Sequence, residues 1–282
     1  MAASGQAATL RFAGRAVLVT GAARSIGEAA ARRLASEGAR IAAAGLDRSG
    51  LKSVAASLCA EGTDIITAVV DTRDAKAIDA FAAEAVTRFG GLDGAVPCAG
   101  IARAASAELM EDEAFASVLA VNLTGVFYTC RAAGRAILAQ GHGSIVTIAS
   151  ITAKGGQPGR ANCAASKWRL VGLTKTLAVE WGGRGVRVNA VAPNGVDTPM
   201  IHDGIPQEFL DEVMLDRTPL GRLAQPQEVA AAIGFLLSGD AAYVNGSVLE
   251  VDGGLTAGFL THRQGADFAL KRDEPKERGK PK

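Results

Sequence analysis

Short apolar runs alternate with amphipathic segments along most of this 282-residue chain. The first apolar run covers residues 16–20 and reaches Gly21, and the alanine-rich segment 26–37 that follows has helical spacing and stops at Gly38. This order is typical of a strand, a tight turn and a helix. Continuous apolar strands that alternate with amphipathic helices predict a parallel sheet with helices on both faces.

The same pattern recurs and predicts seven strands in all. The six later strands are expected at residues 40–44, 65–70, 94–98, 144–149, 186–191 and 248–251. One further helix is expected to begin at about residue 49 and another to end near residue 89. Four more are expected over residues 107–119, 123–140, 162–180 and 226–238. The predicted fold is therefore a Rossmann-like, doubly wound α/β sheet, in which ligands bind beyond the carboxyl ends of the strands.

The alternation continues without a linker, so we expect a single domain over residues 14–260 after an N-terminal extension, 1–13. Residues 194–223 are too long for an ordinary connection and too poor in apolar periodicity for a core element, which predicts a substrate loop or lid. The C-terminal tail 261–282 ends in residues of alternating charge with two prolines, typical of a solvated segment.

Composition excludes several classes of function. A formal charge of +1 gives no electrostatic reason for binding nucleic acid, and 48% hydrophobic residues suit a globular core. No apolar run has the length of a signal peptide core or a membrane span. The four cysteines, Cys59, Cys98, Cys130 and Cys163, lack metal-site spacing and are expected to be reduced thiols in a cytoplasmic protein.

The turn after the first strand has the composition of a phosphate-binding loop. Residues 20–27 read TGAARSIG, and small residues there let backbone N–H groups and a helix N-terminus approach a pyrophosphate. Asp71 follows the third strand, and Ala99 and Gly100 follow the fourth. These positions lay out one edge of the sheet as a dinucleotide-binding edge.

Several motifs together resemble those of the short-chain dehydrogenase/reductase family, over essentially the whole chain apart from its two ends. TGAARSIG is similar to the family pattern TGxxxGIG, and PCAG at 97–100 is similar to NNAG. Residues 163–167 fall at the family's YxxxK, and 193–200 at its PGxxxTPM. The family's strand-five serine falls at Ser150 and its helix asparagine at Asn122.

This resemblance implies an NAD(P)(H)-dependent oxidoreductase that acts on a small carbonyl or alcohol substrate. By the same resemblance, Ser150 holds the substrate oxygen, Lys167 holds the nicotinamide ribose and Asn122 steadies a relay water. The implied cofactor-binding residues are Gly21, Arg24, Ser25, Ile26, Gly27, Asp71, Thr72, Cys98, Ala99, Gly100, Lys167, Pro193, Asn194, Val196 and Thr198. The resemblance also implies a homo-oligomer, commonly a tetramer packed through the helices 123–140 and 162–180.

The family's acid/base tyrosine is replaced by Cys163 in this alignment. Ser150 precedes Cys163 by the family's usual thirteen residues and AASK follows it, while neither Tyr128 nor Tyr243 falls at the site. Lys167 favours the thiolate, but sulfur lies nearer the backbone than a phenolic oxygen and would need water or a deeper substrate pose. We expect carbonyl reduction to be weakened by about 10²- to 10⁴-fold.

Other departures from the family pattern lie on the same edge. Ser25 stands for a glycine, Pro97 and Cys98 for two asparagines, Asn194 for a glycine, and Arg169 for a small residue. A repurposed site and a site released from its former role both fit these changes. The alternatives are a non-redox protein of this fold (cyclase, isomerase, lyase or pseudoenzyme) and an inactivated variant of an active reductase.

For several other side chains, a functional role is weighed against a purely structural one. Cys98 is expected to be a small buried hydrophobe rather than a nucleophile, and a disulfide between Cys98 and Cys163 is not expected. His202 in the predicted lid is either a substitute acid or an exposed side chain. Lys154 and Arg160 either favour an anionic substrate or are solvated loop charges.

The second strand ends without the carboxylate that supports NAD in many members of the family. Gly45 occupies that place and Asp47 follows two residues later. Arg24 is suited to pair with a 2′-phosphate, although no basic residue directly follows Gly45. We therefore expect NADP(H) in preference to NAD(H).

Overall fold

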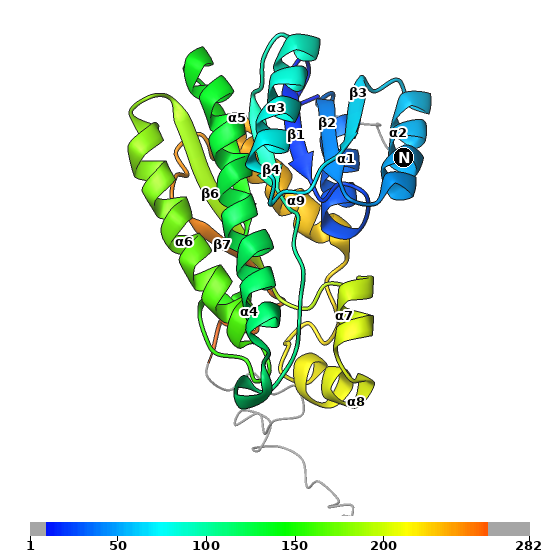
Figure 1. Ribbon diagram of the computed structural model, residues 1–282, viewed down its shortest axis with the longest axis vertical. Helices are drawn as coiled ribbons and strands as arrows, with labels where there is room; N and C mark the ends of the chain where they lie inside the picture. Colours follow the sequence, from blue (N-terminus) through cyan, green and yellow to red (C-terminus); the bar gives the residue numbers. More distant parts are fainter. Residues whose placement is uncertain (1–9, 259–282) are drawn as a thin grey trace, which may run out of the picture.

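The computed structural model describes residues 10–258 as seven parallel strands with helices on both faces (Figure 1). The strands are β1 (Ala16–Thr20), β2 (Arg40–Gly45), β3 (Ile65–Val69), β4 (Gly94–Pro97), β5 (Gly143–Ile148), β6 (Val186–Pro193) and β7 (Val248–Val251). Their order in the sheet is β3-β2-β1-β4-β5-β6-β7. The predicted fold class is confirmed, and the predicted tail 261–282 lies outside the described residues.

The sheet separates two apolar cores. Helices α1 (Ser25–Ser36), α2 (Arg48–Ala60) and α9 (Pro226–Leu237) cover one face, and α3 (Ala75–Phe89), α5 (Val126–Gln140) and α6 (Ala161–Gly182) cover the other. Val17 and Val19 of β1 pack into the first core, while Ala16 and Leu18 pack into the second. Side chains alternate between the faces of a strand, so a strand buried on both faces has to be continuously apolar.

One long helix replaces two that were predicted separately. A short 3-10 turn, Ala107–Leu109, precedes α4 (Asp112–Leu119), which runs through a π-helical turn, Ala120–Gly125, directly into α5. Figure 1 shows α4 and α5 in line. Neither glycine nor proline interrupts residues 119–124, so the chain has no local reason to leave the helix there. The predicted break before residue 123 is wrong.

The long helix also meets the length and composition criteria of a membrane span. Residues Asp112–Gln140 form 29 helical residues with a mean hydropathy of 1.3 in the most apolar window. The helix packs against α3, α6, β4 and β5 in the described structure. Helices that pack in the core of a folded domain also meet these length and composition criteria.

The predicted lid contains regular structure. Residues 194–223 include α7 (Pro199–Gly204), α8 (Gln207–Phe209) and a π-helical turn, Leu210–Leu215, which Figure 1 shows together at one end of the molecule. Leu210 is buried, and a β-bridge joins Val196 to Ala224. The prediction of an irregular segment is wrong because short helices need too few apolar positions to give a clear period.

Candidate active site

Two glycines allow the chain to turn tightly at the carboxyl end of β1. Gly21 has φ +67°, and a Cβ there would lie 2.9 Å from the backbone of Ala99, which follows β4. A Cβ on Gly27 would overlap the carbonyl oxygen of Gly21. Thr20 fixes the same contact, since its Oγ1 accepts a hydrogen bond from Cys98 N at 3.2 Å. Helix α1 therefore begins directly against the ends of β1 and β4.

The first turn of α1 has features of an anion site. Arg24 occupies the N-cap position in an extended conformation, and its side chain makes no capping hydrogen bond. Ser25 follows with φ +56°, the one non-glycine residue with positive φ among residues 10–258. Ile26 packs against the core on the α1 face. With no side-chain cap, the helix N-terminus presents backbone N–H groups and a positive dipole end.

The neighbouring end of β2 has room but no carboxylate directed to it. A Cβ on Gly45 would meet nothing nearer than Ala23 Cβ at 3.7 Å. Asp47 instead caps α2, accepting hydrogen bonds from Gly50 N at 3.0 Å and from Ser49 Oγ at 2.6 Å. The bond from Ser49, the backbone bonds and the charge of Arg24 lower the pKa of Asp47. Asp47 is therefore a helix cap, and Arg24 lies close enough to interact with its charge.

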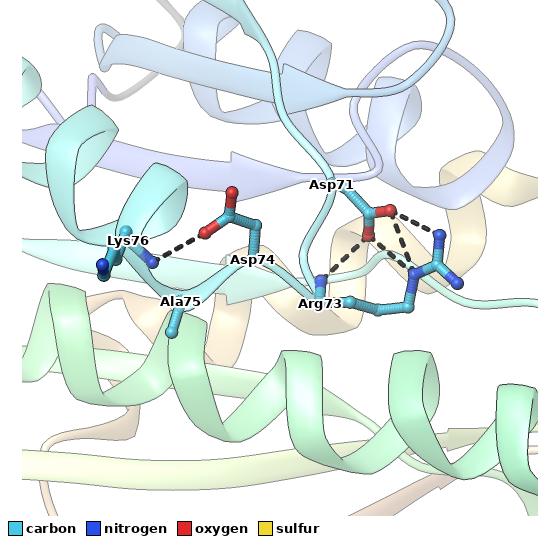
Figure 2. Close-up of a pocket in the computed structure, with 5 residues that line it drawn as sticks. All are labelled: Asp71, Arg73, Asp74, Ala75 and Lys76. Carbon is cyan, nitrogen blue, oxygen red and sulfur yellow. Dashed lines mark hydrogen bonds and ion pairs between the residues drawn. The ribbon is translucent and has the colours of Figure 1, made fainter.

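Asp71 and Thr72 lie beyond the end of β3. Figure 2 shows the guanidinium of Arg73 folded back onto Asp71, in an open surface depression that Asp74, Ala75 and Lys76 also line. Hydrogen bonds from Arg73, the shortest 2.6 Å, lower the pKa of Asp71. Thr72 is buried, and a Cβ on Gly125 would lie 2.7 Å from its Oγ1. The carboxylate of Asp71 is thus paired, whereas the side chain of Thr72 packs against the long helix.

Asn122 lies in the π-helical turn and holds the segment after β4. Its Oδ1 accepts from Ile101 N at 2.9 Å, and its Nδ2 donates to Ile101 O at 3.0 Å. Asn122 is buried and both bonds are partly buried, so the carboxamide fixes the course of the chain just after Gly100. π-helical turns within α-helices frequently occur at functional sites.

Ser150, Cys163 and Lys167 come together at the carboxyl end of β5. Ser150 caps the 3-10 turn Ile151–Ala153, with its Oγ accepting from Thr152 N at 3.2 Å. Thr152 Oγ1 lies 3.8 Å from Cys163 Sγ on α6. One helical turn later, Lys167 Nζ donates to Ile148 O at 2.6 Å, so the lysine spans from α6 back to the strand.

Electrostatics distinguish the groups around Lys167. Burial lowers the pKa of Lys167, while interaction with Cys163 and Cys98 acts in the opposite direction. Burial raises the pKa of Cys98 to about 12 despite the charge of Lys167, so Cys98 stays a neutral thiol. The solvent-accessible surface of Cys98 is of intermediate extent, which still leaves sulfur surrounded mainly by protein. The charge interactions place Lys167 near both thiols.

Asn162 is a functional side chain that sequence reasoning missed. It is fully buried; its Nδ2 donates to Arg103 O and to Ala114 O, and its Oδ1 accepts from Cys163 N at 2.7 Å. It therefore fixes Cys163 relative to the segment after β4 and to α4. An asparagine in the first turn of a predicted helix was the available signal, because such side chains prefer to bond backbone groups.

Hydrogen bonds hold the residues after β6 within the segment and to Thr218. Pro193 ends β6, Asn194 Nδ2 donates to Thr218 Oγ1 at 3.0 Å, and Thr198 Oγ1 donates to Val196 O at 3.1 Å. Val196 itself is buried. Thus the four predicted cofactor residues of this segment form the base from which α7 begins.

The charged side chains considered for substrate binding have protein partners. His202 Nε2 lies 2.7 Å from Asp197 Oδ1 on the exposed face of α7. Lys154 forms an ion pair with Glu250 of β7, and Arg160 donates to Gly204 O at 3.1 Å. Arg160 thereby ties the start of α6 to the end of α7.

Neither tyrosine replaces an acid at this site. Tyr128 lies on α5, where the guanidinium of Arg131 sits 5.1 Å from its ring centre. Tyr243 is fully exposed after α9, with its ring outside the core. The structure thus agrees with the expectation that neither belongs to the group around Lys167.

Known proteins are similar to this chain over most of its length. The family profile described as enoyl-(acyl carrier protein) reductase matches residues 21–256. A D-threitol dehydrogenase from Mycolicibacterium smegmatis is 42% identical over 249 residues, covering 87% of this chain and 94% of that protein. A 3-oxoacyl-acyl-carrier-protein reductase from Thermotoga maritima is 39% identical over 246 residues, covering 87% and 99%.

Solved structures show the same architecture. Levodione reductase superposes with a TM-score of 0.84 at 34% identity, covering 88% of this chain and all of that one. A structure from Beutenbergia cavernae, described as an NAD(P)-dependent gluconate 5-dehydrogenase with NADP bound at low occupancy, has a TM-score of 0.83 at 39% identity, covering 88% and 99%. The chain belongs to the short-chain dehydrogenase/reductase family, a family of NAD(P)-dependent oxidoreductases.

Proposed function

We propose that this protein is an NAD(P)(H)-dependent oxidoreductase for a small carbonyl or alcohol substrate, with Cys163 in place of the acid/base tyrosine. The observation that carries the proposal is Lys167, a half-buried residue of α6 whose Nζ is bonded to Ile148 O at the end of β5, with Cys163 one helical turn before it. A half-buried lysine at this edge suits a ribose hydroxyl. The short thiol makes proton transfer weak or routes it through water.

The residues at the strand ends fit a dinucleotide. Gly21 and Gly27 leave no room for a Cβ, so the chain between them approaches as backbone, and α1 presents an uncapped N-terminus to a pyrophosphate. Lys167 would hold the nicotinamide ribose, and Asn122 keeps the segment around Gly100 in place. When bound, the dinucleotide supplies or accepts the hydride. Ser150 would orient the substrate oxygen, since its hydroxyl faces the same strand end.

NADP(H) is proposed in preference to NAD(H). Arg24 is exposed at the start of α1, and its charge reaches the end of β2, where Gly45 leaves the space open. A guanidinium forms two parallel hydrogen bonds with a phosphate.

We also propose that residues 194–223, which include α7 and α8, act as a lid over the substrate. Arg160 at the start of α6 is hydrogen-bonded to Gly204 O at the end of α7.

A homo-oligomer, a tetramer packed through α5 and α6, is proposed from exposed apolar side chains. On α6, Trp168 is 53% and Val179 is 84% exposed, and Phe127 of α5 is also exposed. Trp168 and Val179 are three helical turns apart and lie on one face of α6. An apolar face on two long helices is expected to be covered by a second copy.

The proposed compartment is a reducing one, the cytoplasm. All four cysteines are free thiols, and two of them, Cys98 and Cys130, have pKa values raised to about 12 by burial. Neutral thiols held in the core need no oxidising environment. Disulfides are rare where thiols are kept reduced, which supports this proposal.

The decisive experiment restores the phenol. Single-turnover oxidation of NADPH with a panel of ketones is measured for the parent, Cys163→Tyr and Cys163→Phe. Phenylalanine is the matched control because it provides the ring without the hydroxyl. We expect the tyrosine variant to be faster than the parent by about 10²- to 10⁴-fold and the phenylalanine variant to gain nothing.

Two results would contradict the proposal in different ways. A tyrosine variant no faster than the parent would show that proton delivery is not what limits the reaction. Turnover of substrate with no change in the oxidation state of nicotinamide would favour isomerisation or elimination, for which Ser150 and Lys167 suffice.

A further inference from the structure

We propose that Cys163 is a nucleophile for aldehydes, and that the protein oxidises an aldehyde to a carboxylic acid through a covalent intermediate on this sulfur. The inference rests on the proposed binding of a nicotinamide dinucleotide but changes the substrate and the role of the thiol. In this activity the aldehyde carbon is bonded to Sγ, and Cys163 does not merely pass a proton.

Two features place positive charge around Cys163. It is the third residue of α6, a helix of 22 residues, so it lies in the first turn, where the helix dipole is positive. Lys167 lies one turn further along, and the charge interaction between the two side chains partly offsets the effect of burial on the pKa of the lysine. A helix N-terminus and a neighbouring cation are surroundings in which reactive cysteines occur.

Hydroxyl groups stand beside the sulfur where an alkoxide would form. Thr152 Oγ1 is 3.8 Å from Cys163 Sγ. Ser150 Oγ accepts from Thr152 N, and within the described part of the chain its own proton has no protein acceptor. Both hydroxyls can donate to the oxygen of a tetrahedral adduct on Sγ. Donors fixed before the reaction begins stabilise such an oxygen without a reorganisation cost.

Covalent attachment also removes the difficulty of reach. A thiol is too short to stand where a phenolic oxygen would, so it is a poor direct proton donor to a distant carbonyl. An aldehyde that adds to sulfur comes to the thiol, and the bond fixes its carbon at this end of β5. The asparagine before the thiol, Asn162, holds the backbone of Cys163 rigidly, as a covalent site requires.

The other thiols are unsuited to the same reaction. Burial raises the pKa of Cys98 and of Cys130 to about 12, so both remain protonated at neutral pH. Cys59 is exposed on α2, the helix after β2, and lies on the opposite face of the sheet from α6. Cys163 is therefore expected to react alone, and Cys59 provides the control.

The steps balance as follows. The thiolate adds to the aldehyde carbon, the carbonyl electron pair moves to oxygen, and the resulting thiohemiacetal oxygen is held by Ser150 and Thr152. Loss of a hydride from that carbon to the oxidised dinucleotide leaves a thioester on Cys163. Water adds to the thioester and the thiolate departs. The sum is aldehyde, oxidised dinucleotide and water giving carboxylate, reduced dinucleotide and two protons.

The first test needs no dinucleotide. The intact protein is treated with iodoacetamide with and without butanal or benzaldehyde, and alkylation of each cysteine is followed by peptide mass spectrometry. We expect both aldehydes to protect Cys163 and to leave the alkylation of Cys59 unchanged. Equal alkylation of Cys163 with and without aldehyde would overturn the proposal.

The second test looks for the acyl group. With NADP⁺ or NAD⁺ and aldehyde present, acid quenching should trap an acyl mass on the peptide that carries Cys163, and NMR should detect the carboxylic acid. Cys163→Ser should lose both products, whereas Cys59→Ser should retain both, with circular dichroism confirming that each variant is folded. Acid formed equally by Cys163→Ser would overturn the proposal.

Calorimetry with NADP⁺ and NAD⁺ separates this inference from the proposed function. A protein that binds dinucleotide and reduces ketones but gives neither protection nor an acyl adduct refutes the nucleophile alone. A protein whose Cys163 is protected by aldehydes but which binds no dinucleotide refutes the proposed redox function and the oxidation step. Its thiol would still be an aldehyde-binding nucleophile.

Discussion

Single residues at the end of β1 determine how closely the chain can turn there. Gly21 and Gly27 approach Ala99 and each other at distances that exclude a Cβ, and Ser25 between them adopts a left-handed conformation that a residue with a side chain rarely takes. The left-handed conformation of Ser25 costs about 1–2 kcal/mol of free energy. We infer that the turn is preserved in shape even though one of its expected glycines is absent.

Gly27→Ala should disturb this turn more than its small change in volume suggests. The added methyl would overlap the carbonyl oxygen of Gly21, so either α1 or the turn must move. We expect a loss of stability of about 1–3 kcal/mol, measured by urea denaturation, and weaker dinucleotide binding by calorimetry. Gly183→Ala is the control, because that glycine ends α6 in a right-handed conformation with no atom within 4 Å of a Cβ. Equal effects of the two substitutions would contradict the steric argument.

At the scale of elements, the C-terminal end of α1 is fastened to two other parts of the chain. Glu37 is buried and bonds Arg33 of the same helix and Arg11 before β1; Arg11 also bonds Asp240 after α9 at 3.0 Å. Burial opposes the charge of Glu37, but the two arginines outweigh it and lower its pKa. This network holds α1 and α9 against the same face of the sheet.

Glu37→Gln should therefore destabilise the protein in a pH-dependent way. At pH 7 the loss is expected to be about 1–3 kcal/mol, since a charge-assisted network is left incomplete. The folded-state pKa lies below the ordinary value of 4.5, so the stabilisation is present above pH 4.5 and is lost as pH falls through the folded-state pKa.

Urea denaturation of the parent and Glu37→Gln from pH 7 down to pH 3 measures this effect, and the two stabilities should converge at the acid end. Glu28→Gln on the same helix removes a more exposed pair with Arg32 and should cost only about 0.3–0.5 kcal/mol. A difference between the parent and Glu37→Gln that does not change with pH would contradict the assignment.

At the scale of the whole molecule, apolar side chains are exposed on the outer surface of the helices that cover the α6 face of the sheet. Val179, Trp168 and Phe127 are large apolar side chains exposed on α5 and α6, although the sheet side of both helices is well packed. A monomer would leave these side chains in water. The proposed tetramer covers them and places the ends of both helices within an interface.

Val179→Glu should break that assembly. Burying a carboxylate in an apolar interface without a partner is costly, so analytical ultracentrifugation is expected to show a tetramer for the parent and smaller species for the variant. Lys52→Glu, a charge change at an exposed position on α2, should remain a tetramer. A monomeric parent, or a variant that sediments like the parent, would contradict the proposed interface.

The fold could be predicted from the sequence because its signal is local and repeated. Each buried parallel strand has to be apolar on both faces and each covering helix amphipathic, so the order of elements follows from the pattern of apolar residues. The errors fell where local signals are weak. The π-helical turn at Ala120–Gly125 has no sequence period of its own, and α7 and α8 are too short to show one.

The sequence by itself determined that Ser150, Cys163 and Lys167 are separated by one strand-to-helix connection and one helical turn, and that neither Tyr128 nor Tyr243 lies near Cys163 along the chain. Only the tertiary structure decided which groups surround them. Asn162 bonds segments 59 and 48 residues away, and Arg160 reaches the end of α7. Such contacts depend on how distant segments pack, and a one-dimensional pattern does not record packing.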